Sequence, residues 1–114
     1  MDVQHPYHVG DNAYPGEEQL SRLLIDGIED YAIFLLDPHG DILTWNTGAA
    51  RLMGYTREEA VGRHFSIFYL PDDQAAEQPQ HLLAAALEKG RAAHEGWHQR
   101  KDGSRFWAEA TLTS

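Results

Sequence analysis

The fold is decided by the stretch YAIFLLDPHGDILTWN, residues 31–46. Its two ends, Tyr31–Asp37 and Ile42–Asn46, are rich in β-branched and aromatic residues, which favours short strands. Between them, Pro38-His39-Gly40-Asp41 has the residue types of a turn. Because the first of these strands is apolar at nearly every position, we expect cover on at least part of both faces.

Helical signals follow the strand pair. Thr47–Tyr55 has apolar residues at helical spacing, with Thr47 placed to cap the helix and Gly54 to end it. Thr56-x-x-Glu59 has the form of a capping box, in which each side chain accepts from the other residue's amide. A longer helix is predicted from Pro79 to Lys89, since proline suits a first turn and Gly90 stands just past the end.

The last part of the chain predicts a hairpin. Glu95–Lys101 and Ser104–Thr113 are the expected strands, and Asp102-Gly103 is a strong signal for the turn between them. Two strands, several short helices and a returning hairpin predict an α+β domain with one covered sheet face. That arrangement makes a chamber rather than a catalytic cleft, which favours sensing or partner binding.

The N-terminal part divides into two predicted segments. Met1–Gly16 is polar and interrupted by prolines and glycines, so we expect a flexible lead-in. Glu17–Glu29 is predicted to be an amphipathic helix that flanks the domain, because apolar residues recur at three- and four-residue spacing. These residues are Leu20, Leu23, Leu24, Gly27 and Ile28. The apolar stripe either docks on its own domain or pairs with a second copy of the chain.

Composition excludes several classes of protein. The net charge is −9 and the pI is near 5.0, so we expect no binding to nucleic acid or to anionic membranes. The chain has no cysteine, which excludes disulfides, thiolate metal sites and cysteinyl adducts within it. It also has neither an apolar run long enough to span a bilayer nor a signal-peptide pattern. We therefore expect a cytoplasmic domain.

No catalytic constellation is found in the sequence. Hydrolase elbows, phosphate loops and dinucleotide fingerprints do not occur. Glu58 and Glu59 are better explained by the electrostatics of a helix start than by acid–base catalysis. His94 and His98 share one face of a predicted strand but lie too far apart for one metal, and we expect surface or rim histidines. The fragment is predicted to be no enzyme and to hold no metal.

Several motifs in order carry a resemblance to a known family. They are Ala32-Ile33 with Asp37 and Gly40, Ile42 through Trp45-Asn46, Ala49-Ala50-x-Leu52-x-Gly54-Tyr55, Thr56-x-Glu58-Glu59-Ala60-Val61-Gly62, Pro71-x-Asp73, and Arg100-Lys101-Asp102-Gly103-Ser104-x-Phe106-Trp107. Together they make the chain from about Leu20 to Ser114 resemble a PAS domain, the sensor module of many bacterial signalling proteins. Phe65–Tyr69 together with Glu95-Gly96-Trp97 is similar to PAS domains that precede histidine kinases.

The resemblance implies a five-stranded antiparallel sheet with short helices packed on one face. It assigns residues 30–114 to the PAS domain and implies frequent dimerisation through the helix Glu17–Glu29. Ser114 falls inside or just after the second hairpin strand, so the final strand is missing or truncated. We therefore expect either a fragment of a longer protein or a sheet edge that another chain fills.

Two functions follow as hypotheses. The first is a sensory, signal-input domain of a multidomain protein, a sensor histidine kinase of a two-component phosphorelay, which relays ligand or redox state by a conformational change to an attached output domain. That output domain would be the kinase. The alternative is a ligand-free module for homodimerisation or protein–protein interaction, within a regulator such as a cyclic-dinucleotide enzyme or a transcription factor.

The resemblance also tests cofactors residue by residue. The reactive Asn-Cys pair of flavin-binding LOV domains would fall at His64-Phe65, and the later flavin-contacting asparagines at about His98 and Ala108. All are absent, so FMN–cysteine photochemistry is excluded. Haem bound through His81 and non-covalent FAD near Trp97 stay open, but the favoured expectation is no cofactor, with a small metabolite or an empty pocket in its place.

A candidate pocket is expected between the sheet and the helices. Its predicted lining is Ile33, Leu35, Leu43, Trp45, Met53, Phe65, Phe68, Leu83 and Trp97. Which face each strand residue occupies depends on register, since a slip of one residue moves every side chain to the other face.

Overall fold

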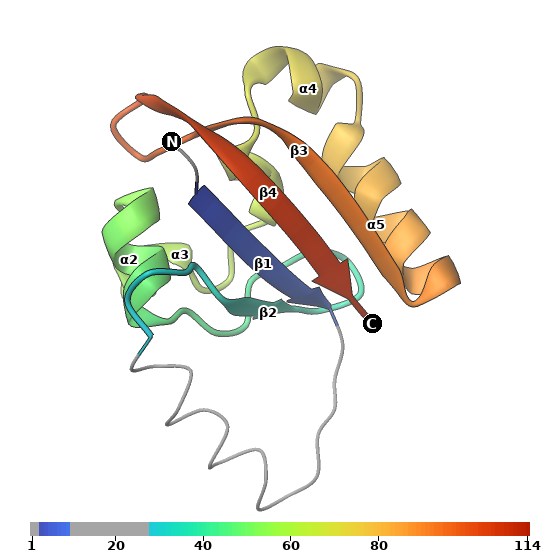
Figure 1. Ribbon diagram of the computed structural model, residues 1–114, viewed down its shortest axis with the longest axis horizontal. Coiled ribbons are helices and arrows are strands. Elements are labelled where there is room, and N and C mark those ends of the chain that lie inside the picture. Colours follow the sequence, from blue (N-terminus) through green and yellow to red (C-terminus); the bar gives the residue numbers. More distant parts are fainter. Residues whose placement is uncertain (1–2, 10–27) are drawn as a thin grey trace, which may run out of the picture.

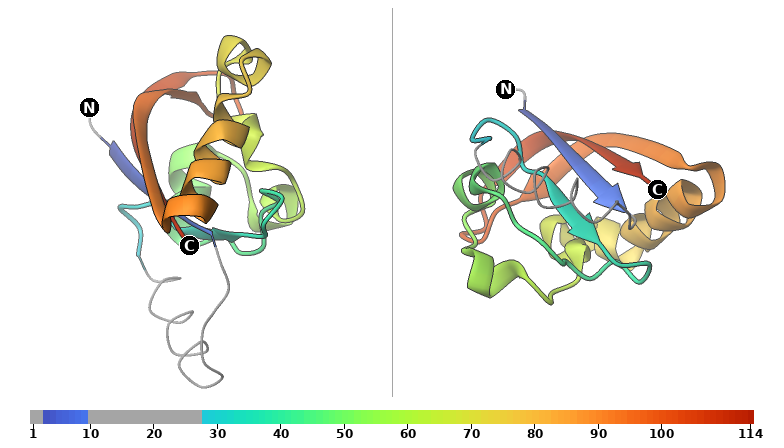
Figure 2. Two further views of the ribbon diagram at one scale, coloured as in Figure 1. Left: turned by 90° about the vertical axis from the view of Figure 1, so that its right-hand side faces the viewer. Right: turned by 90° about the horizontal axis from the view of Figure 1, so that it is seen from below.

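The computed structural model describes residues 3–9 and 28–114. It consists of a β-sheet with helices packed on one of its faces (Figures 1 and 2). Labels follow Figure 1, and the strands are β1 (Val3–Val9), β2 (Phe34–Leu36), β3 (Arg91–Gln99) and β4 (Arg105–Thr113). The helices are α2 (Thr47–Met53), α3 (Arg57–Ala60), the 3-10 helix η1 (Phe65–Phe68), α4 (Pro71–Ala75) and α5 (Gln78–Lys89). The predicted α+β class is confirmed.

The hairpin β3–β4 forms as predicted, although β3 begins at Arg91 rather than at Glu95. The two strands are antiparallel, from the pair Arg91↔Thr113 to the pair Gln99↔Arg105. Gly103 has a φ of +87°, which suits the glycine of the predicted turn. Local turn chemistry was enough to place this element.

Hydrogen bonds at both ends of the hairpin show which of its opposing residue pairs, the rungs of the ladder, are hydrogen-bonded. The Ser114 amide donates to the Gly90 carbonyl over 2.9 Å, and the Arg100 amide donates to the Ser104 carbonyl over 2.8 Å. Because hydrogen-bonded pairs alternate along an antiparallel ladder, the odd-numbered residues of β3 occupy the rungs without hydrogen bonds. The alternating burial of β4 from Phe106 to Leu112 shows that the even-numbered residues face the helices.

The sheet order is β2-β1-β4-β3, so β1 lies between the other two segments of the sheet (Figure 1). β1 is parallel to both neighbours, with Tyr7 opposite Phe34 on one side and Leu112 on the other. The expectation of a flexible lead-in is therefore wrong for Val3–Val9. Hydrogen bonding to β2 and β4 satisfies the backbone groups of β1, and local sequence could not reveal these distant partners. The pairing outweighs the interruption of the strand that was expected at Pro6.

The predicted strand Ile42–Asn46 does not form a regular β-strand. It makes one isolated bridge, Leu36↔Ile42, and a bond from the Leu43 amide to the Leu35 carbonyl. Side chains replace the next ladder bonds, since Thr44 Oγ1 accepts from the Leu35 amide at 3.0 Å and Asn46 Oδ1 accepts from the Ile33 amide at 2.9 Å. β2 is accordingly only Phe34–Leu36, shorter than the predicted Tyr31–Asp37.

Most predicted helix ends are confirmed. Thr56 and Glu59 form the capping box of α3, and Gly54 and Gly90 end α2 and α5 in the left-handed conformation. The cap of α2 differs, because Asn46 rather than Thr47 accepts from the helix amide. The predicted helix Glu17–Glu29 lies outside the described residues except for Ile28 and Glu29, which are not helical.

The core lies between the sheet and the helices. Fully buried side chains come from β2, the segment before α2, η1 and β4, and α5 supplies Leu82, Leu83 and Ala86 to the same cluster. Gly48 of α2 approaches the chain before β2 so closely that a Cβ there would stand 2.0 Å from the Tyr31 carbonyl oxygen. The predicted chamber would lie on this covered face of the sheet.

Candidate functional site

Aromatic side chains from distant parts of the sequence meet on the covered face. Phe34 of β2 contacts Trp45 at 5.0 Å and Phe68 of η1 at 5.7 Å between ring centroids. Trp45 stacks on Phe68 at 5.6 Å with 22° between the ring planes. The Trp45 indole N–H donates to the Tyr55 carbonyl at 2.9 Å, so this tryptophan has its polar atom satisfied inside the core.

The turn of the hairpin is joined to the helices that cover this cluster. Arg100 Nε donates to the Leu52 carbonyl at 2.9 Å, and the Lys101 amide donates to the Met53 carbonyl at 2.9 Å. Lys101 Nζ also pairs with the carboxylate of Glu59 in α3. The turn of the β3–β4 hairpin is therefore bonded directly to α2 and α3.

Five of the nine predicted pocket residues lie in the core. They are Trp45, Met53, Phe65, Phe68 and Leu83. Ile33 and Leu35 are half-buried, and Leu43 and Trp97 are exposed at 48% and 49%, so the prediction is wrong for the last two.

The errors share one physical cause. Ala32, Phe34 and Leu36 are the buried members of the first strand segment, so the alternation is the opposite of the predicted one. Ile42 is buried and Leu43 is not for the same reason. A strand that is apolar at every position contains no signal for which side faces the helices.

Tyr69 and His98 are buried polar residues that the predicted lining omits. Tyr69 follows η1, and His98 belongs to β3. Their backbones form an isolated β-bridge, and the centroids of their rings lie 4.6 Å apart. Both side chains are fully buried, so the expectation of a surface histidine is wrong for His98. The four-residue spacing of His94 and His98, placed on one face of β3, was the available signal.

The Tyr69 hydroxyl is the unusual atom of this site. It is fully buried and has no hydrogen-bond partner among the described residues. Burial raises the pKa of Tyr69, and the negative charge of Asp73 raises it further. The phenol therefore stays protonated at physiological pH and remains available as a hydrogen-bond donor.

His94 shares the inner face of β3 with His98. Its Nδ1 atom is buried and, within residues 28–114, has no hydrogen-bond partner. An imidazole nitrogen donates or accepts according to its tautomer. Among the described residues, the Tyr69 hydroxyl and His94 Nδ1 thus both lack a hydrogen-bond partner.

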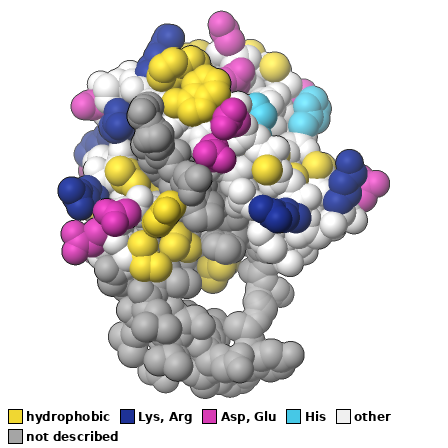
Figure 3. All heavy atoms as spheres, in the orientation of Figure 1, with side chains coloured by type: hydrophobic (Ala, Val, Ile, Leu, Met, Phe, Trp, Pro, Cys, Tyr) yellow, Lys and Arg dark blue, Asp and Glu magenta, His cyan; other side chains and the backbone are white. Residues whose placement is uncertain are grey.

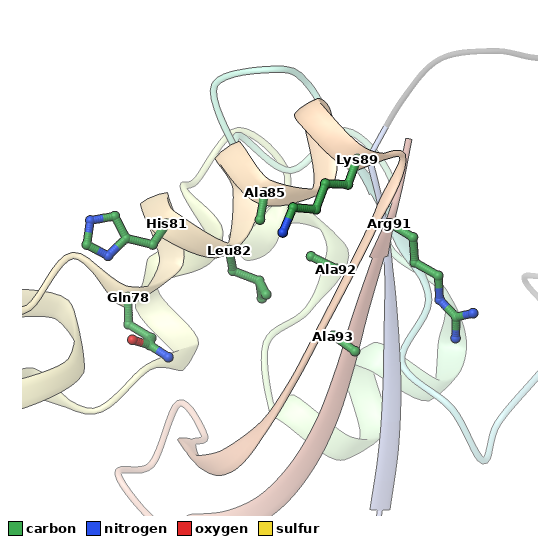
Figure 4. A pocket seen from close by; sticks show the side chains of 8 residues that line it. All are labelled: Gln78, His81, Leu82, Ala85, Lys89, Arg91, Ala92 and Ala93. Carbon is green, nitrogen blue, oxygen red and sulfur yellow. The ribbon is translucent and has the colours of Figure 1, made fainter.

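A groove of about 400 Å³ opens between α5 and β3 (Figure 4). It is lined by Gln78, His81, Leu82, Ala85, Lys89, Arg91, Ala92 and Ala93. The His81 side chain is exposed and extends away from β3, so it does not point into the core. Trp97 lies on the outer sheet face, where it cannot stack on a group inside. His81 and Trp97 therefore both lie outside the buried core.

Residues 3–9 and 28–114 contain neither a candidate metal cluster nor a helix suited to cross a membrane. Within these ranges, no group of three or more His, Cys, Asp or Glu side chains could hold a metal ion. None of the helices described there is both long and apolar enough to cross a bilayer.

Comparison with known proteins gives consistent matches. Residues 30–114 match the family model described as PAS domain. The two-component system protein A of Emericella nidulans is 51% identical over 92 residues, which cover 81% of this chain and 14% of that protein. The cell-division control histidine kinase PdhS of Brucella ovis is 36% identical over 55 residues, covering 48% of this chain and 5% of the kinase.

A solved structure shows the same fold. The crystal structure of the PAS domain of a protein from Colwellia psychrerythraea superposes with a TM-score of 0.72 and 27% sequence identity. The superposition covers 83% of this chain and 79% of that one. The chain thus spans most of a solved PAS domain but only a small part of the length of the curated relatives.

Proposed function

Because the chain belongs to the PAS domain family, we propose that it is the signal-input module of a longer signal-transduction protein, with a sensor histidine kinase as the attached output. The similarity to a two-component system protein and to a histidine kinase supports this output. A PAS domain is a sensor module and not itself catalytic, so any kinase chemistry belongs to other domains. We place the module in the cytoplasm, in keeping with a sequence that has no cysteine.

The signal we propose is a small organic ligand bound on the covered face of the sheet. The supporting observation is the buried Tyr69 hydroxyl, which has no hydrogen-bond partner within the described part of the chain. Leaving a buried polar group unpaired costs about 1–3 kcal/mol. A ligand with an acceptor atom beside Tyr69 regains that free energy, while Trp45, Phe68 and Met53 contribute apolar contact.

The relay follows from the bonds around the hairpin turn. A ligand that displaces Phe68 or Trp45 changes the packing beneath α2, whose last carbonyls accept from Arg100 and Lys101. The ligand shifts the equilibrium between two packings by the difference in its affinity for them. The output domain then responds to the position of the β3–β4 hairpin.

The first test is an absorbance spectrum of the purified domain in the visible range, with mass spectrometry of any molecule that denaturation releases. We expect no haem or flavin bands and a released molecule that carries a hydrogen-bond acceptor. Tyr69→Phe should reduce its occupancy about tenfold, because one hydrogen bond is lost and the ring is kept. Phe106→Leu, on the same inner face but without a polar atom, is the matched control.

Two results would contradict the proposal. Strong Soret or flavin bands would mean that a cofactor other than the proposed ligand occupies the chamber. Equal occupancy in the wild type and in Tyr69→Phe would mean that the hydroxyl does not contact the ligand.

The second candidate is a ligand-free dimerisation module. The amphipathic pattern of Glu17–Glu29 favours it, since a stripe of leucines on one helix face is typical of a helix pair. Light scattering after size-exclusion chromatography tests it: Leu20→Glu with Leu24→Glu should turn a dimer into a monomer. A wild-type monomer at high concentration would remove this candidate.

A further inference from the structure

Among the described strands, β3 has an unpaired edge, and this edge lies beside the groove between α5 and β3. β3 is the last strand in the order β2-β1-β4-β3, and β4 is its one neighbour in the described sheet. Its odd-numbered residues occupy the rungs without hydrogen bonds to β4, so their amides and carbonyls point to the opposite edge. For Ala93 and Glu95, these backbone groups have no hydrogen-bond partner within the described part of the chain.

The open part of this edge is short and has a limit at each end. At one end, Tyr69 forms its isolated β-bridge with His98 and so covers the edge there. At the other end, the strand meets α5 through the left-handed turn at Gly90. The stretch 91–95 stays open between these limits, which suits an added segment of about five residues in extended conformation.

The groove of about 400 Å³ follows this edge. Its lining takes Ala92 from the inner face of β3, and Arg91 and Ala93 from the outer face. Because residues of both faces line one groove, the groove passes around the edge of the strand rather than over one face. Leu82 and Ala85 of α5 lie opposite, and the small alanine side chains leave room for a further backbone (Figure 4).

The lining of the groove contains basic side chains and no acidic one. Lys89 and Arg91 stand where α5 meets β3, and Figure 4 shows the Lys89 side chain extending back between the helix and the strand. Neither residue has an ion-pair partner among the residues that the structure describes. In Figure 3, basic side chains are visible on the side of the molecule where α5 meets β3. Within a chain of net charge −9, this end of the groove favours a negatively charged group.

We propose that the open edge of β3 binds an extended, acidic segment of a partner protein, which joins the sheet as a further strand. The amide and carbonyl of Ala93 pair with the backbone of the segment, as in other proteins that add a strand to a sheet edge. Acidic side chains of the segment lie against Lys89 and Arg91, and a small apolar side chain contacts Leu82. This site is at the edge of the sheet, outside the proposed ligand chamber, so binding here does not depend on a ligand there.

Two other occupants fit the groove less well. A second copy of this chain would bring its own α5, which lies along β3 at the same edge of the sheet (Figure 1). Two helices would then compete for the space over one pair of strands. A fatty carboxylate could contact Leu82, Ala85 and Lys89, but it has no backbone to pair with the amide and carbonyl of Ala93. An extended peptide uses both the edge and the basic end of the groove.

The probe is a short peptide of alternating threonine and valine with two aspartates at one end. One control peptide has lysine in place of aspartate, and the other has N-methyl groups on alternate amides, which prevents strand pairing. The measurement is an NMR titration of the whole chain. We expect the aspartate peptide alone to shift the amide signals of Ala93 and Glu95 and to slow their hydrogen exchange.

Variants of the chain test the two kinds of contact. Ala93→Pro removes an amide that β4 does not use, so the hairpin is kept while peptide binding weakens about tenfold. Ala93→Ser keeps the amide and is its matched control. Lys89→Gln with Arg91→Gln should weaken binding about fivefold. Arg57→Gln with Arg105→Gln removes two exposed cations elsewhere, changes the net charge equally and should weaken binding less than about twofold.

Four results would overturn the proposal. Equal binding of the N-methylated peptide would mean that no strand is added. Equal losses in the two double variants would mean that attraction follows net charge alone. Slow exchange at Ala93 without any peptide would mean that a segment of this chain or a second copy already occupies the edge. Tighter binding of decanoate than of the aspartate peptide would assign the groove to a fatty carboxylate.

Discussion

Asn46 is the residue that joins the start of the domain to its first helix. It is 2% exposed, and its side chain makes four bonds to described residues: Oδ1 accepts from the amides of Ile33 and Ala49, and Nδ2 donates to the carbonyls of Ile28 and Tyr31. One amide side chain thus caps α2 and holds the segment that leads into β2. Only a group with a donor and an acceptor side by side satisfies all four partners.

The loss of stability on replacing Asn46 therefore depends on which residue takes its place. Asn46→Ala should lower the free energy of unfolding by about 2–3 kcal/mol, because buried donors and acceptors are left unpaired. Asn46→Asp should cost more, since a carboxylate oxygen would face the carbonyls of Ile28 and Tyr31. Thr44→Ala, which removes the single bond to the Leu35 amide, is the control and should cost about 1 kcal/mol.

Urea denaturation followed by circular dichroism measures these values. Similar losses for Asn46→Ala and Thr44→Ala would contradict the role assigned to Asn46. A fully folded Asn46→Asp with wild-type stability would mean that the two carbonyls do not need a donor.

At the scale of elements, the turn between β2 and Ile42 depends on one carboxylate. Asp37 Oδ1 accepts from the amides of His39 and Asp41, each at 2.9 Å. The Asp41 amide, more than the His39 amide, holds the pKa of Asp37 below its usual 3.8, against an opposing effect of desolvation. The folded state therefore favours the ionised carboxyl, and this contribution to stability exists above pH 3.8 and is lost as the pH falls through the lower folded pKa.

Asp37→Asn keeps the acceptor oxygen and removes the charge. At pH 7 this variant should be less stable than the wild type by a few tenths of a kcal/mol, a small value because the site is open to solvent. The difference should shrink as the pH drops below 3.8, since the wild type then loses its charged acceptor. Urea midpoints of both proteins at neutral and acid pH measure it, and a difference that grows on acidification would contradict the assignment.

At the scale of the whole molecule, β1 holds the two parts of the sheet together. It has three register pairs with β2 and six with β4. Pro6 lies opposite Thr111 and has no amide hydrogen, so the strand gives up a backbone donor in the middle of the sheet. The proline therefore weakens the pairing of this central strand with its neighbour.

Two substitutions test this position of β1. Pro6→Val restores a backbone donor at a position that pairs with Thr111 of β4 and should raise stability by about 1 kcal/mol. Tyr7→Pro removes a donor from a residue that pairs with both Phe34 and Leu112, and should lower stability by a similar or larger amount. Thermal unfolding measures both changes. If neither variant shifts the midpoint, Val3–Val9 does not occupy the centre of the sheet.

Sequence and structure agree most closely where the cause is local. The Asp102-Gly103 turn, the capping box of Thr56 and Glu59, and the ends of α2 and α5 at Gly54 and Gly90 were all predicted. Each depends on the conformational preferences of a few consecutive residues, such as the freedom of glycine at positive φ. The PAS family also followed from local motifs, because their order along the chain is itself a sequence property.

Tertiary structure decided what depends on distant partners. Which residues of Tyr31–Asp37, of Ile42–Asn46 and of β3 face the helices, and so the exposure of Leu43 and Trp97, required the register of the sheet. The strand β1, the side-chain bonds of Thr44 and Asn46 in place of a ladder, and the burial of Tyr69 beside His98 arise between segments far apart in sequence. Local sequence determines the elements and their ends, whereas the free energy that selects a face or a neighbour comes from burial and pairing across the whole fold.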